Sequence, residues 1–134
     1  MNDIALLRPS TLVDSPAFSH VAVIPPSATT IHVGGQNAVD SNGVLVGADD
    51  VAAQSKRALA NVEAALAAAD ASLADVVSYT ILFVDGIDVG AAYGAVAGTL
   101  DTGGESALVT AAMVAGLAVP GALVEIAATA AVRR

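Results

Sequence analysis

The sequence predicts an α+β fold in which two helices cover one face of a mixed β-sheet. Two observations support this class. Residues 50–69 and 89–100 have the apolar spacing or the composition of helices. Stretches rich in Val, Ile and Thr lie before, between and after them, as expected for strands. The resulting order is strands, helix, strand, helix, strands, and a length of 134 residues suits one domain, spanning residues 1–134.

The N-terminal third is predicted to contain strands and turns. Residues 1–14 are expected to form a loosely ordered lead-in with a short strand at 4–7. A strand near 17–24 is followed by a turn at 25–27, because neither proline there can continue a ladder. Residues 29–34 form the next strand. Asn42-Gly43 then favours a type I′ hairpin turn, with residues 44–46 returning.

The rest of the chain contains both helices. Asp49 or Asp50 caps the first helix, which runs to about residue 69. Its apolar stripe consists of Val51, Ala58, Leu59, Val62 and Leu66. The elements expected after it are a strand at 76–84, a helix at 89–100, a loop at 101–104, and strands at 107–114 and 123–132 joined by a turn at 116–121.

The composition indicates the kind of core and the compartment. The chain is 55% hydrophobic but only 3% aromatic, so its core is expected to consist of Ala, Val, Leu and Ile. With no Cys, it has neither disulfides nor thiolate ligands. No apolar run is long enough to span a bilayer, and Met1-Asn2-Asp3 lacks the basic start of a secretory signal. We therefore expect a cytoplasmic protein without membrane partners.

The charge balance bears on the partners of the protein. The formal net charge is −8, and the five Lys and Arg residues form no stripe. Because nucleic-acid binding depends on neutralising phosphates, we expect no nucleic-acid partner. The high apolar fraction with few charges indicates instead that one surface is covered by another subunit.

The final strand contains the most informative single residue. Val124 and Ile126 alternate with Leu123 and Glu125, so the two pairs point to opposite sides of the strand. Glu125 is the only charge in a long apolar run. Since burying a bare carboxylate is costly, Glu125 is expected either to face a wet pocket or partner, or to lie at a strand edge in water.

Several motifs together resemble the Rid family, also called the YjgF/YER057c/UK114 family. The resemblance runs from about residue 18 to residue 132, and the motifs occur in the family's order: Phe18-Ser19-His20, Val33-Gly34-Gly35-Gln36, 51–62, 75–85 and the closing Val124-Glu125-Ile126. It implies a chorismate-mutase-like fold and a homotrimer in which uncovered sheet faces meet. In that family, small-molecule pockets lie between subunits.

The resemblance also implies a reaction and its residues. Rid proteins hydrolyse enamines and imines, using an arginine that holds the substrate carboxylate and a glutamate that positions or activates water. Glu125 matches that glutamate, and Gly35 and Gln36 match the glycine and glutamine of the family's Ser-Gly-Gln. The family serine is Gly34 here, and the family tyrosine is Phe18, which lacks the hydroxyl.

The family arginine has no basic counterpart in this sequence. Counting back from the final strand places it at Val109, before Thr110, whereas counting on from the second helix places it near Glu105-Ser106. A pocket lined by Val109 favours an apolar or uncharged ligand. The protein is then either an atypical hydrolase that uses Glu125 and water, or a non-catalytic small-molecule binding or interaction protein of the same fold.

Three further residues are candidates for the site. His20 has either a polar role at the pocket rim or a packing role in its strand. Tyr93 lines the pocket or packs in the core. His20 and His32 lie on strands expected to form a hairpin, where they could face each other. No pattern supplies a third ligand, so we expect neither a metal nor a cofactor.

Overall fold

The central feature of the fold is a four-stranded mixed sheet with the strand order β3 (Ala28–Gln36), β6 (Val124–Arg133), β4 (Val76–Val84) and β5 (Leu108–Val114). The computed structural model describes residues 3–134. Strands β4 and β5 are parallel, while β6 is antiparallel to both of its neighbours. The parallel pair requires a crossover, which helix α2 (Val89–Leu100) provides. The predicted combination of two helices with a mixed sheet is confirmed.

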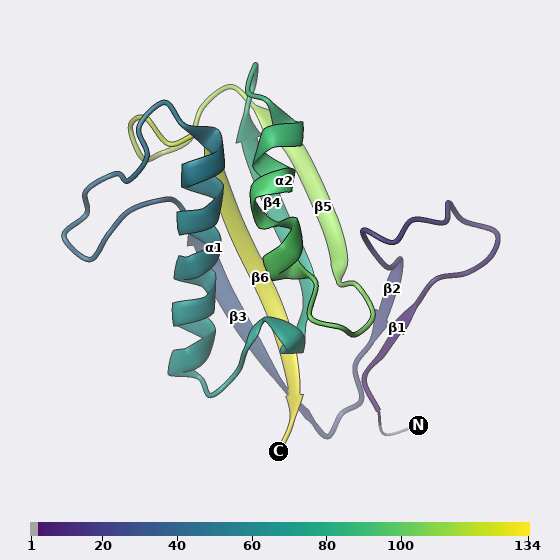
Figure 1. Cartoon of the computed structure of the whole chain (residues 1–134). Coiled ribbons are helices and arrows are strands. Elements are labelled where there is room, and N and C mark those ends of the chain that lie inside the picture. The colour runs from purple at the N-terminus through teal and green to yellow at the C-terminus, as the bar shows by residue number, and fades with distance from the viewer. Residues whose placement is uncertain (1–2) are drawn as a thin grey trace.

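Both helices begin at an aspartate that caps them. Helix α1 (Val51–Ala68) starts after Asp50, whose carboxylate accepts a hydrogen bond from the Ala53 amide at 3.0 Å. Helix α2 starts after Asp88, which accepts from Ala91 in the same way. The two helices lie in front of the sheet in Figure 1. A short 3₁₀ helix, η1 (Leu73–Asp75), leads into β4.

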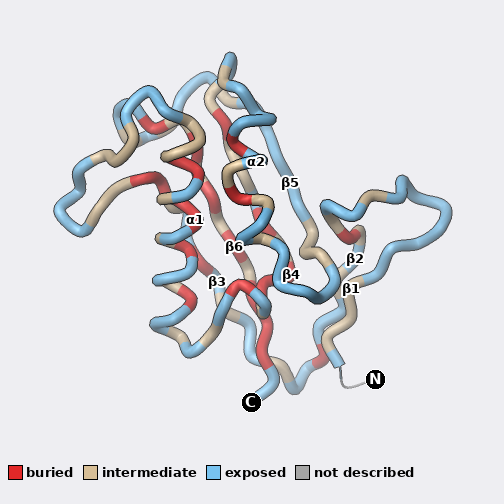
Figure 2. The backbone as a smooth tube through the Cα atoms, viewed as in Figure 1, coloured by how far each residue is buried: buried red, intermediate tan, exposed pale blue. Residues whose placement is uncertain are grey.

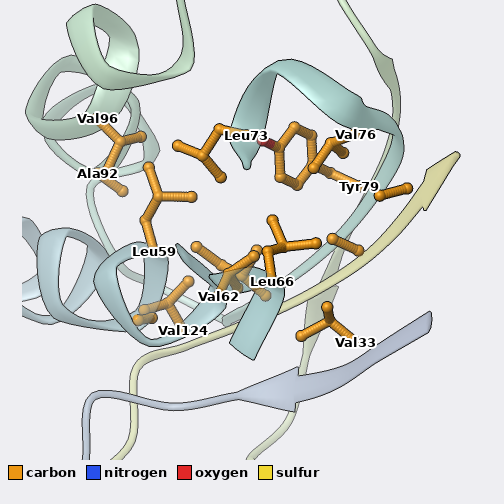
Figure 3. Packing of buried hydrophobic residues seen from close by; sticks show 14 of the residues in the cluster. Val33, Leu59, Val62, Leu66, Leu73, Val76, Tyr79, Ala92, Val96 and Val124 are labelled. Carbon is orange, nitrogen blue, oxygen red and sulfur yellow. The ribbon is translucent and has the colours of Figure 1, made fainter. Parts of the chain in front are cut away.

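The hydrophobic core lies between the helices and the sheet. Leu59, Val62 and Leu66 of α1 are almost completely buried, and they pack with Val124 and the alternate residues that follow it on β6. Figure 2 shows this buried layer in red, and Figure 3 shows its side chains from close by. Because side chains alternate along a strand, the remaining residues of the sheet face away from the helices.

We call that uncovered side of the sheet the open face. Its residues pair across the strands in register and are small or polar for the most part. They include His32 on β3, Ser78, Thr80 and Leu82 on β4, Leu108, Thr110, Ala112 and Val114 on β5, and Glu125, Ala127 and Thr129 on β6.

The N-terminal strands pair differently from the prediction. The strand expected at 17–24 is only β2 (Val21–Val23), and it pairs with β1 (Ala5–Leu7) rather than with β3. The turn at 25–27 therefore does not close a hairpin in the sheet, because the short β2 finds its backbone partners in the lead-in. Figure 1 shows this ribbon beside β5. Met1 and Asn2, on which part of the lead-in and signal arguments rest, lie outside the described residues.

The turn at Asn42-Gly43 is present but is not of type I′. That type needs positive φ at both central residues, whereas Gly43 (φ 78°) has positive φ and Asn42 does not. The carboxylate of Asp40 accepts hydrogen bonds from the amides of Asn42 and Val44, at 2.9 and 3.0 Å. These two hydrogen bonds stabilise a three-residue loop in which only Gly43 has a positive φ, whereas a type I′ turn would need a second such residue.

Candidate functional site

The carboxylate of Glu125 lies on the open face, directly over Gly35 of β3. A Cβ atom built on Gly35 would stand 2.6 Å from Oε2 and 2.7 Å from Cδ of Glu125. Val124 and Ile126 on either side are buried toward the helices, while Glu125 is only partly buried. The expectation that Glu125 and its two neighbours point in opposite directions is confirmed.

Gly35 belongs to a β-bulge in the edge strand. Val33 pairs with Ala128 and Gln36 pairs with Ile126, so three steps on β3 span only two steps on β6. The amide of the Gln36 side chain donates a hydrogen bond to the Gly34 carbonyl at 3.1 Å, which holds the bulge. A bulge bends its strand and redirects nearby side chains, and here it brings bare backbone under a carboxylate.

A shallow hollow of about 100 Å³ continues the open face away from Glu125. It is lined by His32, Ser78, Thr80, Ala127 and Thr129, with Val33 and Ala128 at its base. Thr110 lies on the same face, since it pairs with Thr80, which in turn pairs with Ala127. The surface around Glu125 therefore offers hydroxyl groups and small side chains.

No cation accompanies Glu125 within the described part of the chain. Glu125 takes part in none of the ion pairs found among residues 3–134. Of the five basic residues, Arg8 pairs with Asp14 and Arg133 with Asp3, and Arg134 donates to the Ala69 carbonyl. The other two, Lys56 and Arg57, belong to α1 on the covered side. A substrate carboxylate would find no positive partner beside Glu125 in a single chain.

Val109 and Tyr93 lie on the other side of the sheet. Val109 pairs with Tyr79, which is buried under the helices, and it lines a helix-side cavity together with Tyr93. The family resemblance implies that Val109 and Glu125 share a pocket between subunits, and within one chain the sheet separates them. The reason is the alternation of side chains, which puts Thr110 rather than Val109 on the face of Glu125.

The N-terminal candidates form a third group. The half-buried rings of Phe18 and His20 pack edge to face, with centroids 5.3 Å apart. His20 Nε2 lies 2.8 Å from the Val13 carbonyl oxygen. The backbone of Ser19 donates to the Ala107 carbonyl at 3.2 Å, which ties this segment to the start of β5.

His20 and His32 do not face each other. His32 lies on β3, where its Nδ1 is 3.3 Å from the Thr129 hydroxyl oxygen. His20 lies directly before β2, which pairs with β1. Their expected juxtaposition is wrong because β2 pairs with β1. Within residues 3–134, no group of three His, Asp or Glu side chains is placed to hold a metal.

Gln54 positions the site and was not among the predicted residues. Its side chain is fully buried and donates to the carbonyls of Gly47 and Gly121, each at 3.2 Å. Its Oε1 accepts from the Leu123 amide at 2.8 Å. Gln54 thus fixes the backbone two residues before Glu125. In the sequence, the only indication of this role was that Gln54 is a polar residue on the apolar stripe of α1.

Comparisons with known proteins agree on one family. The family model described as Endoribonuclease L-PSP matches residues 11–132. The chain is 35% identical to YyfB from Yersinia pestis, a Rid-family protein of unknown function, with 98% of this chain and 100% of that chain covered and a TM-score of 0.86.

Two further solved structures are similar. Rv2704 from Mycobacterium tuberculosis, of the YjgF/YER057c/UK114 family, is 28% identical over 97% of this chain and 100% of that chain, with a TM-score of 0.63. The YjgF gene product from E. coli is 29% identical over 78% and 81%, with a TM-score of 0.69. Among proteins with curated descriptions, none matches the sequence.

Neither helix within residues 3–134 has the length and apolar character to cross a bilayer.

Proposed function

The chain belongs to the Rid family, also called the YjgF/YER057c/UK114 family, and from this premise we propose that it hydrolyses imine-type compounds with Glu125 as the group that activates water. One observation carries the proposal. A partly exposed carboxylate lies over the bare backbone of Gly35, with no ion-pair partner among residues 3–134. Such a carboxylate is free to accept a proton from water.

The reaction balances with water as the only co-reactant. The water oxygen attacks the imine carbon while Glu125 accepts one of its protons. The C=N bond becomes a single bond, and its nitrogen takes up a proton from solvent to give a carbinolamine. Glu125 then returns its proton to that nitrogen, the C–N bond breaks, and the C=O bond forms as the hydroxyl proton passes to solvent, which restores the proton taken up earlier. The products are a carbonyl compound and an amine or ammonia.

The substrate is proposed to be uncharged. An arginine fork would contribute about 1.5–3 kcal/mol to binding a carboxylate, because hydrogen bonds to charged groups are the stronger ones. Neither Val109, Thr110 nor Glu105 is basic. Arg8 lines the helix-side cavity together with Tyr93 and Val109, but its guanidinium group already lies 3.2 Å from the Asp14 carboxylate and 3.9 Å from that of Glu105. A 2-imino acid would therefore lose most of its anchoring, whereas an uncharged imine has no such requirement.

A second copy of the chain is proposed to complete the site. The open face is uncovered in one chain, and hydroxyl and methyl groups dominate the part of it around Thr80 and Thr110. In a homotrimer of the kind the family resemblance implies, this face would meet a neighbouring subunit. Phe18, His20, Tyr93 and Val109 would then reach a pocket with Glu125 only across such an interface.

A non-catalytic binding protein is the alternative, favoured by the lack of an anchoring cation. The printed description of the matching family model names an endoribonuclease, but a net charge of −8 without a basic stripe gives RNA little to bind. A binding protein is also consistent with the position of both tyrosines, which line the helix-side cavity and lie away from the Glu125 carboxylate within one chain.

The test of the proposal is the Glu125→Gln variant. Glutamine keeps the size of the side chain and loses the base, so the rate of hydrolysis of an uncharged imine should fall about 100-fold or more. Glu63→Gln, at an exposed position of α1, is the matched control and should retain the wild-type rate. Equal rates for wild type, Glu125→Gln and buffer alone would favour the binding protein.

A further inference from the structure

The helix-side cavity has a cation at its mouth. The cavity has a volume of about 750 Å³, and Arg8 is the one basic residue among the described residues that line it. In the trimer proposed above, Tyr93 and Val109 bring this cavity into the pocket of Glu125. The availability of Arg8 therefore decides which charge on a ligand the pocket accepts.

The guanidinium group of Arg8 is only partly occupied. Its Nη2 atom donates to the Asp14 carboxylate at 3.2 Å and to the Ser15 carbonyl. Its Nη1 atom lies 3.9 Å from Oε2 of Glu105, which is too far for a hydrogen bond. Since an arginine has five N–H donors, those of Nη1 and Nε have no acceptor among residues 3–134. Glu105 thus lies beside the donors that a ligand carboxylate would need.

The backbone around this ion pair is fixed by contacts between two distant segments. Arg8 directly follows β1, which pairs with β2. Glu105 lies in the loop between α2 and β5, and the hydroxyl of the next residue, Ser106, donates to the Pro16 carbonyl at 2.7 Å. These contacts keep the Glu105 carboxylate near the guanidinium group.

Acidic groups outnumber the cation at the mouth of the cavity. Asp101 and Glu105 both line the cavity, and Asp14 contacts Arg8 as well. A ligand carboxylate that approached Arg8 would be repelled by these charges at short range. Proteins select between ligands by such repulsion as well as by attraction. The cavity therefore disfavours an anion even though it contains an arginine.

The contact of Arg8 with Glu105 contributes little to the stability of the fold. The side chains of the two residues are 33% and 62% exposed, and exposed ion pairs are weak. Removing the charge of Glu105 should therefore leave the protein folded and Arg8 in place, because Asp14 and the Ser15 carbonyl still hold its Nη2 atom.

We propose that Glu105 determines the charge specificity of the pocket by keeping carboxylates away from Arg8, an inference that rests on the proposed function. With the Glu105 charge present, the pocket takes uncharged substrates. Without it, Nη1 and Nε of Arg8 bind a substrate carboxylate through charged hydrogen bonds.

Two stable probes of nearly equal size test the charge preference. Pyruvate carries a carboxylate, whereas pyruvamide is uncharged. Ligand-observed NMR titrations at constant ionic strength measure both affinities. Glu105→Gln should strengthen pyruvate binding by about five- to tenfold, between the effects of an exposed ion pair and of a charged hydrogen bond. Its affinity for pyruvamide should stay within about twofold of that of wild type.

Two further variants test the role of Arg8. Asp101→Asn is the matched control, because it removes one negative charge from the cavity lining and Asp101 makes no ion pair with Arg8. It should change pyruvate affinity by about twofold or less. Arg8→Met combined with Glu105→Gln should return pyruvate affinity to the wild-type value.

Three results would overturn the proposal. They are no gain of pyruvate affinity in Glu105→Gln, an equal gain in Asp101→Asn, and a gain that survives the loss of Arg8. None of these measurements depends on turnover. A wild-type protein that fails to hydrolyse imines would therefore contradict the proposed reaction without changing the outcome for Arg8 and Glu105.

Discussion

The Glu125 carboxylate occupies the space that a side chain at residue 35 would need, with Oε2 only 2.6 Å from the position of a Cβ atom on Gly35. The neighbouring Gly34 has no such restriction, since a Cβ atom there meets nothing within 4 Å. Neither glycine has a positive φ. The room for an added Cβ atom at these two positions therefore differs because of the Glu125 carboxylate.

Gly35→Ala should displace Glu125 without unfolding the protein, because the atoms that must move belong to a flexible side chain. We expect activity that depends on Glu125 to fall about tenfold or more, since misplaced catalytic groups lose the advantage of proximity. The free energy of unfolding should change by less than about 1 kcal/mol. Gly34→Ala is the control, and equal activity losses in both variants would show that the contact with Glu125 is not the cause.

The buried pair Gln54 and Ser55 tests how the strand of Glu125 is held. Gln54→Leu leaves the carbonyls of Gly47 and Gly121 and the amide of Leu123 without their partner, so unfolding should become easier by about 2–4 kcal/mol. The Ser55 hydroxyl is buried and has no partner among residues 3–134, so Ser55→Ala should be neutral or stabilising. Urea unfolding measures both, and a similar loss in the two variants would contradict this account.

Burial, with a smaller effect from Glu63, raises the pKa of Tyr79, which predicts a loss of stability in alkali. Because its folded-state pKa is about 12 and its ordinary value is 10.0, the stabilisation is complete below pH 10 and is lost as the pH rises through about 12. The difference corresponds to about 3 kcal/mol at most. Unfolding free energies measured across this range should fall less steeply in Tyr79→Phe than in wild type.

The uncovered open face predicts a homotrimer. Light scattering at micromolar concentration should give the mass of three chains. Thr80→Arg, at the centre of that face, should dissociate the assembly because it places a charge between packed subunits. Lys56→Glu, on α1, should leave it intact. A stable wild-type monomer would remove the inter-subunit pocket but not Glu125 itself.

Local patterns predicted much of the fold. The alternation of side chains along the final strand predicted that Glu125 points away from Val124 and Ile126, because alternation is a property of the strand alone. The capping preference of aspartate placed the start of α1 after Asp49 or Asp50, and the structure selects Asp50. These features depend on interactions within a few residues of the chain.

Pairings between distant segments were harder to predict. The partner of β2 depends on whether three residues pair with the lead-in or with β3, and the sequence of β2 does not distinguish them. The side of the sheet on which Val109 lies depends on its register with Tyr79. A shift of one residue moves a side chain to the other face, so counting residues from a motif does not tell on which face of the sheet Val109 lies. The single-chain separation of Glu125 from Val109 follows from that register.

The most direct test of the account follows the decay of two imines, 2-iminopropionate and its methyl ester, which lacks the negative charge, with wild type and Glu125→Gln. We predict that wild type accelerates decay of the ester-derived imine, that Glu125→Gln does not, and that the decay of 2-iminopropionate is hardly changed by either protein. Efficient hydrolysis of 2-iminopropionate by wild type would contradict the account, since it would require an anchoring cation that no described residue supplies beside Glu125 in a single chain.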